Sequence, residues 1–120
     1  MGSARQARYL TNRIRERDAF ERLRREGTRI HSKSLWCNYL SDPVTTPSCT
    51  AFAIGRAVGP AVVRNRLRRR LRVLLTARQR TDPLPPGLLL IGARRGAVEL
   101  TFDQLRAELE LMLDRLDRCS

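Results

Sequence analysis

The chain has 120 residues and a formal net charge of +12, with 24 lysines and arginines against 12 aspartates and glutamates. This length is near the commonest domain size and predicts one domain over residues 1–120 with a single apolar core. The charge predicts an anionic partner, which could be nucleic acid, a membrane surface or an acidic protein. No apolar run approaches the length of a membrane span, so we expect no membrane partner and a cytoplasmic location.

Residues 1–13 are polar and rich in arginine, without hydrophobic periodicity, which predicts an arm that is flexible until it meets a partner. A short helix is expected over residues 15–26, ended by Gly27. Phe20 lies on its apolar stripe. A single aromatic residue there is usually core, and we leave open whether Phe20 packs on the sheet or faces a ligand.

Three strands are expected next. Residues 28–30 fit a short edge strand, and residues 34–40 are rich in strand formers. Asp42, Pro43 and Pro47 supply turn residues, so residues 49–58 are expected to return as the second strand of a hairpin.

The following helix is the central feature of the chain. Gly59 and Pro60 are suited to a helix start, and a helix is expected from residue 60 to about 78. Residues 64–72 hold six arginines in nine positions, and no acidic residue occurs from 43 through 81. One apolar stripe at helical spacing can pack on a core and leaves the arginines outside. Its members are Val63, Leu67, Leu71 and Leu74.

So many guanidiniums on one helix repel each other by a few tenths of a kcal/mol per i, i+4 pair. Phosphates would relieve this repulsion, because the guanidinium fork bonds phosphate oxygens in pairs. A solvated charged face is the alternative, but such faces ordinarily mix signs. We therefore expect nucleic-acid contacts from this helix. The candidate residues are Arg64, Arg66, Arg68, Arg69, Arg70 and Arg72.

The last third of the chain predicts a strand and a helix. Residues 80–87 are rich in proline and cannot form a regular element, and residues 88–93 are a continuous apolar run typical of a strand covered on both faces. Its neighbours should be the earlier strands. Thr101 and Gln104 fit a capping box at the start of a final helix, which is acidic overall. The order of elements predicts an α+β fold with helices packed on a small sheet.

No catalytic or metal-binding constellation is visible. The cysteines and the single histidine are scattered, without zinc-ligand spacing: Cys37, Cys49, Cys119 and His31. Glu16 and Asp18 stand among arginines and are interpreted as charge balance. We therefore expect no catalytic residue, no metal and no small-molecule substrate.

Residues 52–69 resemble the protein subunit of bacterial ribonuclease P. They match its strand, its Gly-x-Ala-Val from Gly59, and its Arg-Asn-Arg-x-Lys-Arg from Arg64, with Arg68 in the lysine place. Residues 12–14, 18–20, 27–28 and 88–94 resemble further family segments in the same order. The resemblance covers roughly residues 12 to 116.

This resemblance implies an α-β-β-β-α-β-α two-layer sandwich with a small mixed sheet and a left-handed β-α-β crossover at the arginine helix. It implies that a catalytic RNA, using Mg²⁺, removes the 5′ leader of precursor tRNA, and that the protein binds both RNAs and no cofactor of its own. By this resemblance Asn65, and Arg56 in the turn before the helix, join the helix arginines as expected contacts with the catalytic RNA. The leader would lie in a cleft between the first helix and the sheet. The expected cleft residues are Asn12, Arg13, Phe20, Arg24, Leu35 and Trp36. The family has an aromatic pair at the places of Leu35 and Asn38, and Trp36 or Tyr39 could replace it only if the strand register shifts.

Two other functions stay open at this stage. A structural RNA-binding module, such as a ribosome-associated protein, would bind RNA without affecting tRNA processing. A self-sufficient nuclease would cleave without added RNA, but the chain offers no general base or metal cluster for it.

Overall fold

The computed structural model describes residues 12–13, 17–43, 45 and 48–119. The described elements, in chain order, are β1 (Asn12–Arg13), α2 (Arg17–Glu26), β2 (Thr28–His31), β3 (Leu35–Ser41), β4 (Cys49–Ala53), α3 (Ala61–Thr81), β5 (Gly87–Ala93), the 3-10 helix η1 (Arg95–Glu99) and α4 (Phe102–Cys119). The predicted succession of helices and strands is confirmed, and the helix and strand ends differ from the expected ones by a few residues.

The strands form one mixed sheet in the order β1-β4-β5-β3-β2. β5 pairs in parallel with β4 and antiparallel with β3, so the apolar run lies between two earlier strands as predicted. The predicted hairpin between β3 and β4 is wrong. β5 lies between them, and this central place, with helices on both faces of the sheet, suits a strand whose side chains are apolar on both faces. β4 also ends at Ala53, before a turn in which the Val58 amide donates to the Gly55 carbonyl.

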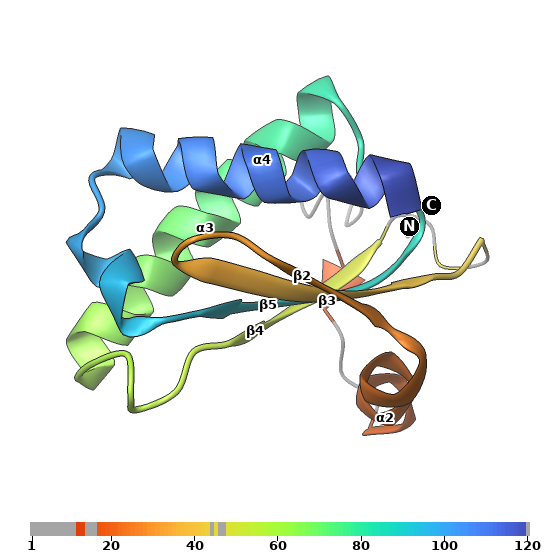
Figure 1. Ribbon diagram of the computed structural model, residues 1–120, viewed down its shortest axis with the longest axis horizontal. Helices are drawn as coiled ribbons and strands as arrows, with labels where there is room; N and C mark the ends of the chain where they lie inside the picture. The colour runs from red at the N-terminus through yellow and green to blue at the C-terminus, as the bar shows by residue number, and fades with distance from the viewer. Residues whose placement is uncertain (1–11, 14–16, 44, 46–47, 120) are drawn as a thin grey trace, which may run out of the picture.

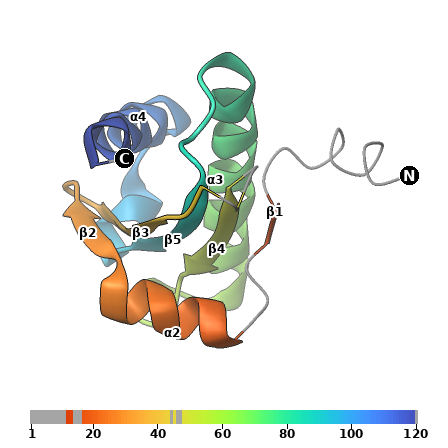
Figure 2. The same cartoon turned by 90° about the vertical axis from the view of Figure 1, so that its right-hand side faces the viewer.

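Helices cover the two faces of the sheet unequally. α3 and α4 lie side by side on one face, and α2 crosses one end of the other (Figures 1 and 2). The main core fills the space under α3 and α4, while a smaller cluster around Leu23 and Leu88 lies under α2. The α+β class is confirmed, with α2 as a partial further layer. α3 connects the parallel strands β4 and β5, and a left-handed crossover there stays a prediction of the resemblance.

The N-terminal prediction is partly corrected. Residues 1–11 lie outside the described residues. Asn12 and Arg13 are not part of a free arm, because their backbones pair in parallel with Cys49 and Thr50 of β4. This pairing places them at one edge of the sheet.

Two devices hold α4 in place. Its start is the predicted capping box, in which the Gln104 amide donates to Thr101 Oγ1 at 3.1 Å and the Thr101 amide donates to Gln104 Oε1 at 2.9 Å. Near the end of α3 the buried Arg78 donates to Glu110 at 2.8 Å and lies 3.3 Å from Asp114. The two helices are therefore joined by a buried cation and carboxylates of α4.

Candidate nucleic-acid interface

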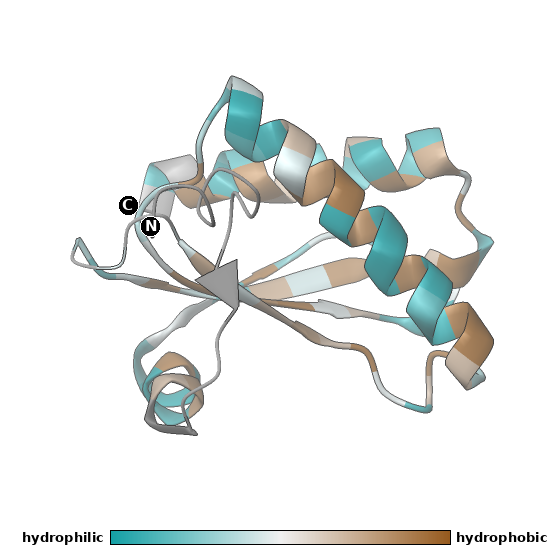
Figure 3. Ribbon diagram, turned by 180° about the vertical axis from the view of Figure 1, so that it is seen from behind, coloured by the Kyte–Doolittle hydropathy of each residue, from teal (hydrophilic) through white to brown (hydrophobic). Residues whose placement is uncertain are grey.

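The arginines of α3, apart from the buried Arg78, occupy three rows along the helix. The first row, Arg64, Arg68 and Arg72, flanks the core side next to β4, and Arg66 and Arg70 lie on the opposite flank. Asn65, Arg69 and Arg80 point away from the core, as the helical spacing requires. In Figure 3 hydrophilic segments alternate with hydrophobic ones along this helix, whose buried face is mainly leucine.

The first row is held by backbone carbonyl oxygens and one aromatic ring. Arg64 Nε donates to the Gly59 carbonyl at 3.1 Å, and Arg68 Nη2 donates to the Ile54 carbonyl at 3.0 Å. The Arg72 guanidinium lies 5.8 Å from the centre of the Phe52 ring. These contacts orient the three guanidiniums, and no acidic side chain of the described residues forms an ion pair with them.

The other candidate side chains of α3 are more open. Asn65, Arg66 and Arg69 are exposed and Arg70 is half-buried. Asn65 accepts a hydrogen bond from Arg68, whereas the other three make no ion pair with the described acidic residues. The outward arrangement predicted for the arginines is confirmed, and no described carboxylate neutralises them.

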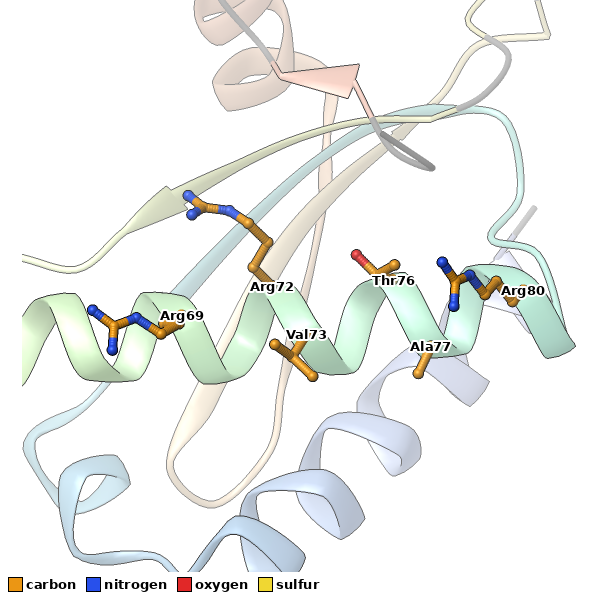
Figure 4. Close-up of a pocket in the computed structure, with 6 residues that line it drawn as sticks. All are labelled: Arg69, Arg72, Val73, Thr76, Ala77 and Arg80. Carbon is orange, nitrogen blue, oxygen red and sulfur yellow. The ribbon is translucent and has the colours of Figure 1, made fainter. Parts of the chain in front are cut away.

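The second half of α3 carries one exposed basic residue, Arg80, that sequence reasoning missed. A shallow pocket runs along this part of the helix, where Arg72 points toward β4 while Arg69 and Arg80 flank Val73 and Thr76 (Figure 4). Arg80 lies three helical turns after Arg69, on the same side of the helix. The repeat of basic residues at helical spacing beyond residue 72 was the signal that could have found it.

The turn between β4 and α3 carries a further arginine. Arg56 is exposed in this turn, as expected. Arg95 Nε, from η1, donates to the Ala57 carbonyl at 3.4 Å, so two arginines from distant parts of the chain flank one turn. Arg95 follows β5 and belongs to no helical pattern, which is why the sequence did not single it out.

A second surface lies on the sheet face that carries α2. Trp36 is paired with His31 of β2 and Gly92 of β5, so these residues point to the same side. A Cβ atom at Gly92 would lie 2.0 Å from Cε2 of the Trp36 ring, so the indole occupies the space that only glycine leaves free. The Arg29 guanidinium lies 4.3 Å from the centre of the ring. Trp36 is thus a half-buried aromatic platform with a cation on it.

The prediction that Leu35 lines this surface is wrong. Leu35 is 0% exposed and belongs to the core beneath α3 and α4. Successive residues of a strand face opposite sides, so Leu35 and Tyr39 share the core face and Trp36 the other. Tyr39 is buried and its hydroxyl donates to the Pro86 carbonyl at 2.9 Å. Of the two aromatic alternatives, the structure therefore leaves only Trp36.

The side chains of α2 differ in their exposure. Leu23 is fully buried, Phe20 is 38% exposed and Arg24 is exposed, so Phe20 is not a core residue. Asn38 lies on the same sheet face, but α2 covers it and its side-chain amide donates to the Leu23 carbonyl at 3.2 Å. Asn12 and Arg13 stand in β1, at the β4 edge of the sheet.

Two arginines contact His31. Arg94 Nη2 lies 2.9 Å from His31 Nδ1, and Arg115 Nη1 donates to the His31 carbonyl at 2.7 Å. The structure brings together no group of three or more histidine, cysteine, aspartate or glutamate side chains that could hold a metal ion within the described part of the chain. Among the helices it describes, none is long and apolar enough to cross a membrane.

The two surfaces meet at one end of the sheet. Trp36, Gly92 and Ala53 form a row across β3, β5 and β4, and the turn that leads into α3 begins just after Ala53. A small α+β domain with uncompensated arginines beside an aromatic platform defines a class of protein that binds an extended polyanion.

Comparison with known proteins gives the particular family. The Ribonuclease P family model matches residues 10–117. The ribonuclease P protein component of Streptomyces avermitilis is 38% identical over 114 residues, covering 88% of this chain and 91% of that protein. The component of Symbiobacterium thermophilum is 33% identical over 106 residues, covering 86% and 89%. This chain therefore belongs to the ribonuclease P protein family, the protein subunits of an endoribonuclease that processes tRNA, and its partner is the RNase P RNA.

Solved structures agree on the fold. The RNase P protein of Staphylococcus aureus superposes with a TM-score of 0.78 at 19% identity, covering 88% of this chain and 94% of that one. The protein of Thermotoga maritima gives a TM-score of 0.76 at 21% identity, covering 87% and 96%.

Proposed function

We propose that this chain binds the catalytic RNA of RNase P through α3 and the 5′ leader of precursor tRNA through the sheet face that carries Trp36. In this proposal the RNA cleaves the leader, using Mg²⁺, and the protein supplies binding and no catalytic group. The observation that carries the proposal is the set of α3 arginines that no described carboxylate neutralises. Phosphates are the partner that suits such a set.

The sheet face supports the part of the proposal that concerns the leader. A single strand without fixed sequence is bound by aromatic faces that stack on bases and by cations that follow the backbone. Trp36 supplies the aromatic ring, and Arg29, Arg24 and Arg94 are exposed basic residues of β2, α2 and the end of β5. Phe20, which is partly exposed on α2, is a second aromatic candidate.

The position of these surfaces supports simultaneous binding of both RNAs. The row from Trp36 to Ala53 ends where the turn carrying Arg56 begins, and Arg95 contacts that turn. A leader on the Trp36 face and a catalytic RNA on the first turns of α3 would therefore approach each other at one end of the sheet. The protein would hold the cleavage point between them.

The test is cleavage of a precursor tRNA by an RNase P RNA at low magnesium, with and without this protein. We expect cleavage at the mature 5′ end under multiple turnover only when both components are present, and none with the protein alone. A precursor with a leader of one nucleotide is the matched control, and the protein should improve its binding much less than that of a long leader. Equal improvement for both precursors would remove leader binding from the account.

A further inference from the structure

A small hollow separates α3 from η1, on the flank of α3 opposite to Arg68. It has a volume of about 140 Å³. Four apolar and two basic residues line it: Val63, Arg66, Leu67, Arg70, Ala97 and Val98. We propose that this hollow takes one unstacked base of the RNA that binds α3. The inference rests on the proposed function and names a contact within it.

The floor of the hollow suits the face of a planar ring. Leu67 is 3% exposed and Ala97 is 2% exposed, while Val63 and Val98 are half-buried and form the two walls. Small-molecule sites usually have volumes of about 300 to 1,000 Å³, so this hollow is too small for such a ligand. Its volume equals that of roughly five water molecules, and the side chains of Leu67 and Ala97 offer water no hydrogen bonds. A single base removes this apolar surface from water.

The rim of the hollow supplies the charges that a nucleotide needs. Arg66 and Arg70 stand one turn apart on α3, and neither makes an ion pair or side-chain hydrogen bond with another described residue. Their guanidiniums can bind the phosphates on either side of an inserted base or stack on the base itself. Unstacked bases in loops and bulges of RNA are recognised in this way.

The hollow exists before any partner binds. Its second wall is fixed by hydrogen bonds from the Ala97 amide to the Arg94 carbonyl at 3.0 Å and from the Leu100 amide to the Ala97 carbonyl at 3.3 Å. Arg95 also ties this wall to the turn before α3. A preformed site loses little conformational entropy on binding, so base insertion adds its interaction energy to that of the phosphate contacts.

Filling the hollow tests the proposal. Val63→Phe places a ring in it from α3, and Val98→Phe does so from η1. Val62→Phe is the matched control, because Val62 is the adjacent residue of α3, is 78% exposed and does not line the hollow. The measurement is the dissociation constant of each variant with RNase P RNA, together with its salt dependence. Thermal unfolding of each free variant shows that the fold is kept.

We expect Val63→Phe and Val98→Phe to weaken binding about tenfold, within the range for loss of one stacked base. The slope with salt should stay unchanged, because no phosphate contact is removed, and Val62→Phe should bind as the parent does. If Val63→Phe or Val98→Phe folds and still binds the RNA with the affinity of the unaltered protein, the proposal that a base inserts into the hollow is wrong. This outcome differs from failure of the proposed function, in which Arg64→Ala and Arg66→Ala would also leave RNA affinity and its salt slope unchanged.

Discussion

Trp36 shows how one residue can define a surface. Its indole lies over Gly92 and beneath the Arg29 guanidinium, on a sheet face where its strand neighbour Leu35 cannot reach. The two residues are consecutive in β3. Because successive side chains of a strand face opposite sides of the sheet, Trp36 is available to a ligand and Leu35 is not. Any side chain larger than hydrogen at residue 92 would collide with the ring.

Replacement of Trp36 by alanine tests this surface. We expect Trp36→Ala to weaken holoenzyme binding of a precursor tRNA with a long leader by roughly tenfold, since a stacked base contributes about 1 to 3 kcal/mol. Binding of mature tRNA should be unchanged. Dissociation constants for both RNAs measure the effect. Phe102→Ala, which removes a partly exposed aromatic at the start of the acidic α4, is the control and should change neither constant.

At the scale of single residues, sequence reasoning located the arginines better than the cleft. The burial of Leu67, Leu71 and Leu74 follows from their spacing, so the arginines between them had to face outward. Leu35 was misplaced because the resemblance supplied its position without the strand register. Arg29 was missed because its role depends on the adjacent strand, which brings Trp36 beneath it.

We expect the arginine helix to be the element that determines RNA affinity. Removal of one phosphate contact should reduce the salt dependence of binding by about one unit of slope or less. We therefore expect Arg64→Ala and Arg66→Ala each to weaken binding to RNase P RNA and to flatten its plot against log salt. Arg106→Ala, in α4, is the control, because Arg106 is equally basic but pairs with Asp103. A slope that stays the same after both α3 substitutions would remove these residues from the phosphate contacts.

The junction between α3 and α4 depends on a different arginine. The Arg78 side chain is 2% exposed and contacts Glu110 and Asp82 through hydrogen bonds, with Asp114 within 3.3 Å. Arg78→Ala should lower the free energy of unfolding by about 2 kcal/mol, because the buried contacts and the packed stem are lost while the partly exposed carboxylates regain water. Urea unfolding measures this change.

Arg80→Ala provides the comparison for that experiment. Arg80 is exposed on the outward side of the same helix, two residues further on, and should be neutral for stability within about 0.5 kcal/mol. Equal stability of both variants would contradict a structural role for Arg78.

The elements themselves were largely predictable, whereas their pairing was not. The apolar run of β5, the stripe of α3 and the capping box of α4 are local patterns, and each is present in the structure. The pairing of β3 with β5 is not local, because β5 follows β4 and α3 in the chain and still lies between β3 and β4. A prolyl turn after β3 suggested a hairpin, but the wholly apolar β5 takes the central place between β3 and β4.

At the scale of the whole molecule, the charge is divided between two helices. The acidic residues of α4 include Glu110 and Asp114, which contact Arg78, while Glu108 accepts hydrogen bonds from the amide of Ser34 and the hydroxyl of Ser32. The α3 arginines that no described carboxylate neutralises and the Trp36 surface approach each other at the end of the sheet where β4 and β5 finish. We expect this uneven distribution of charge to orient the protein toward RNA.

The most direct test of the central claim, that α3 holds the catalytic RNA, is the magnesium dependence of precursor tRNA cleavage with the double variant Arg64→Ala/Arg66→Ala. With RNase P RNA, we expect the unaltered protein to support cleavage at low magnesium and the variant to fail there. The two should converge at high magnesium, where cations screen the RNA phosphates without the protein. If the double variant supports cleavage at low magnesium as well as the unaltered protein does, the arginine helix is not what holds the RNA.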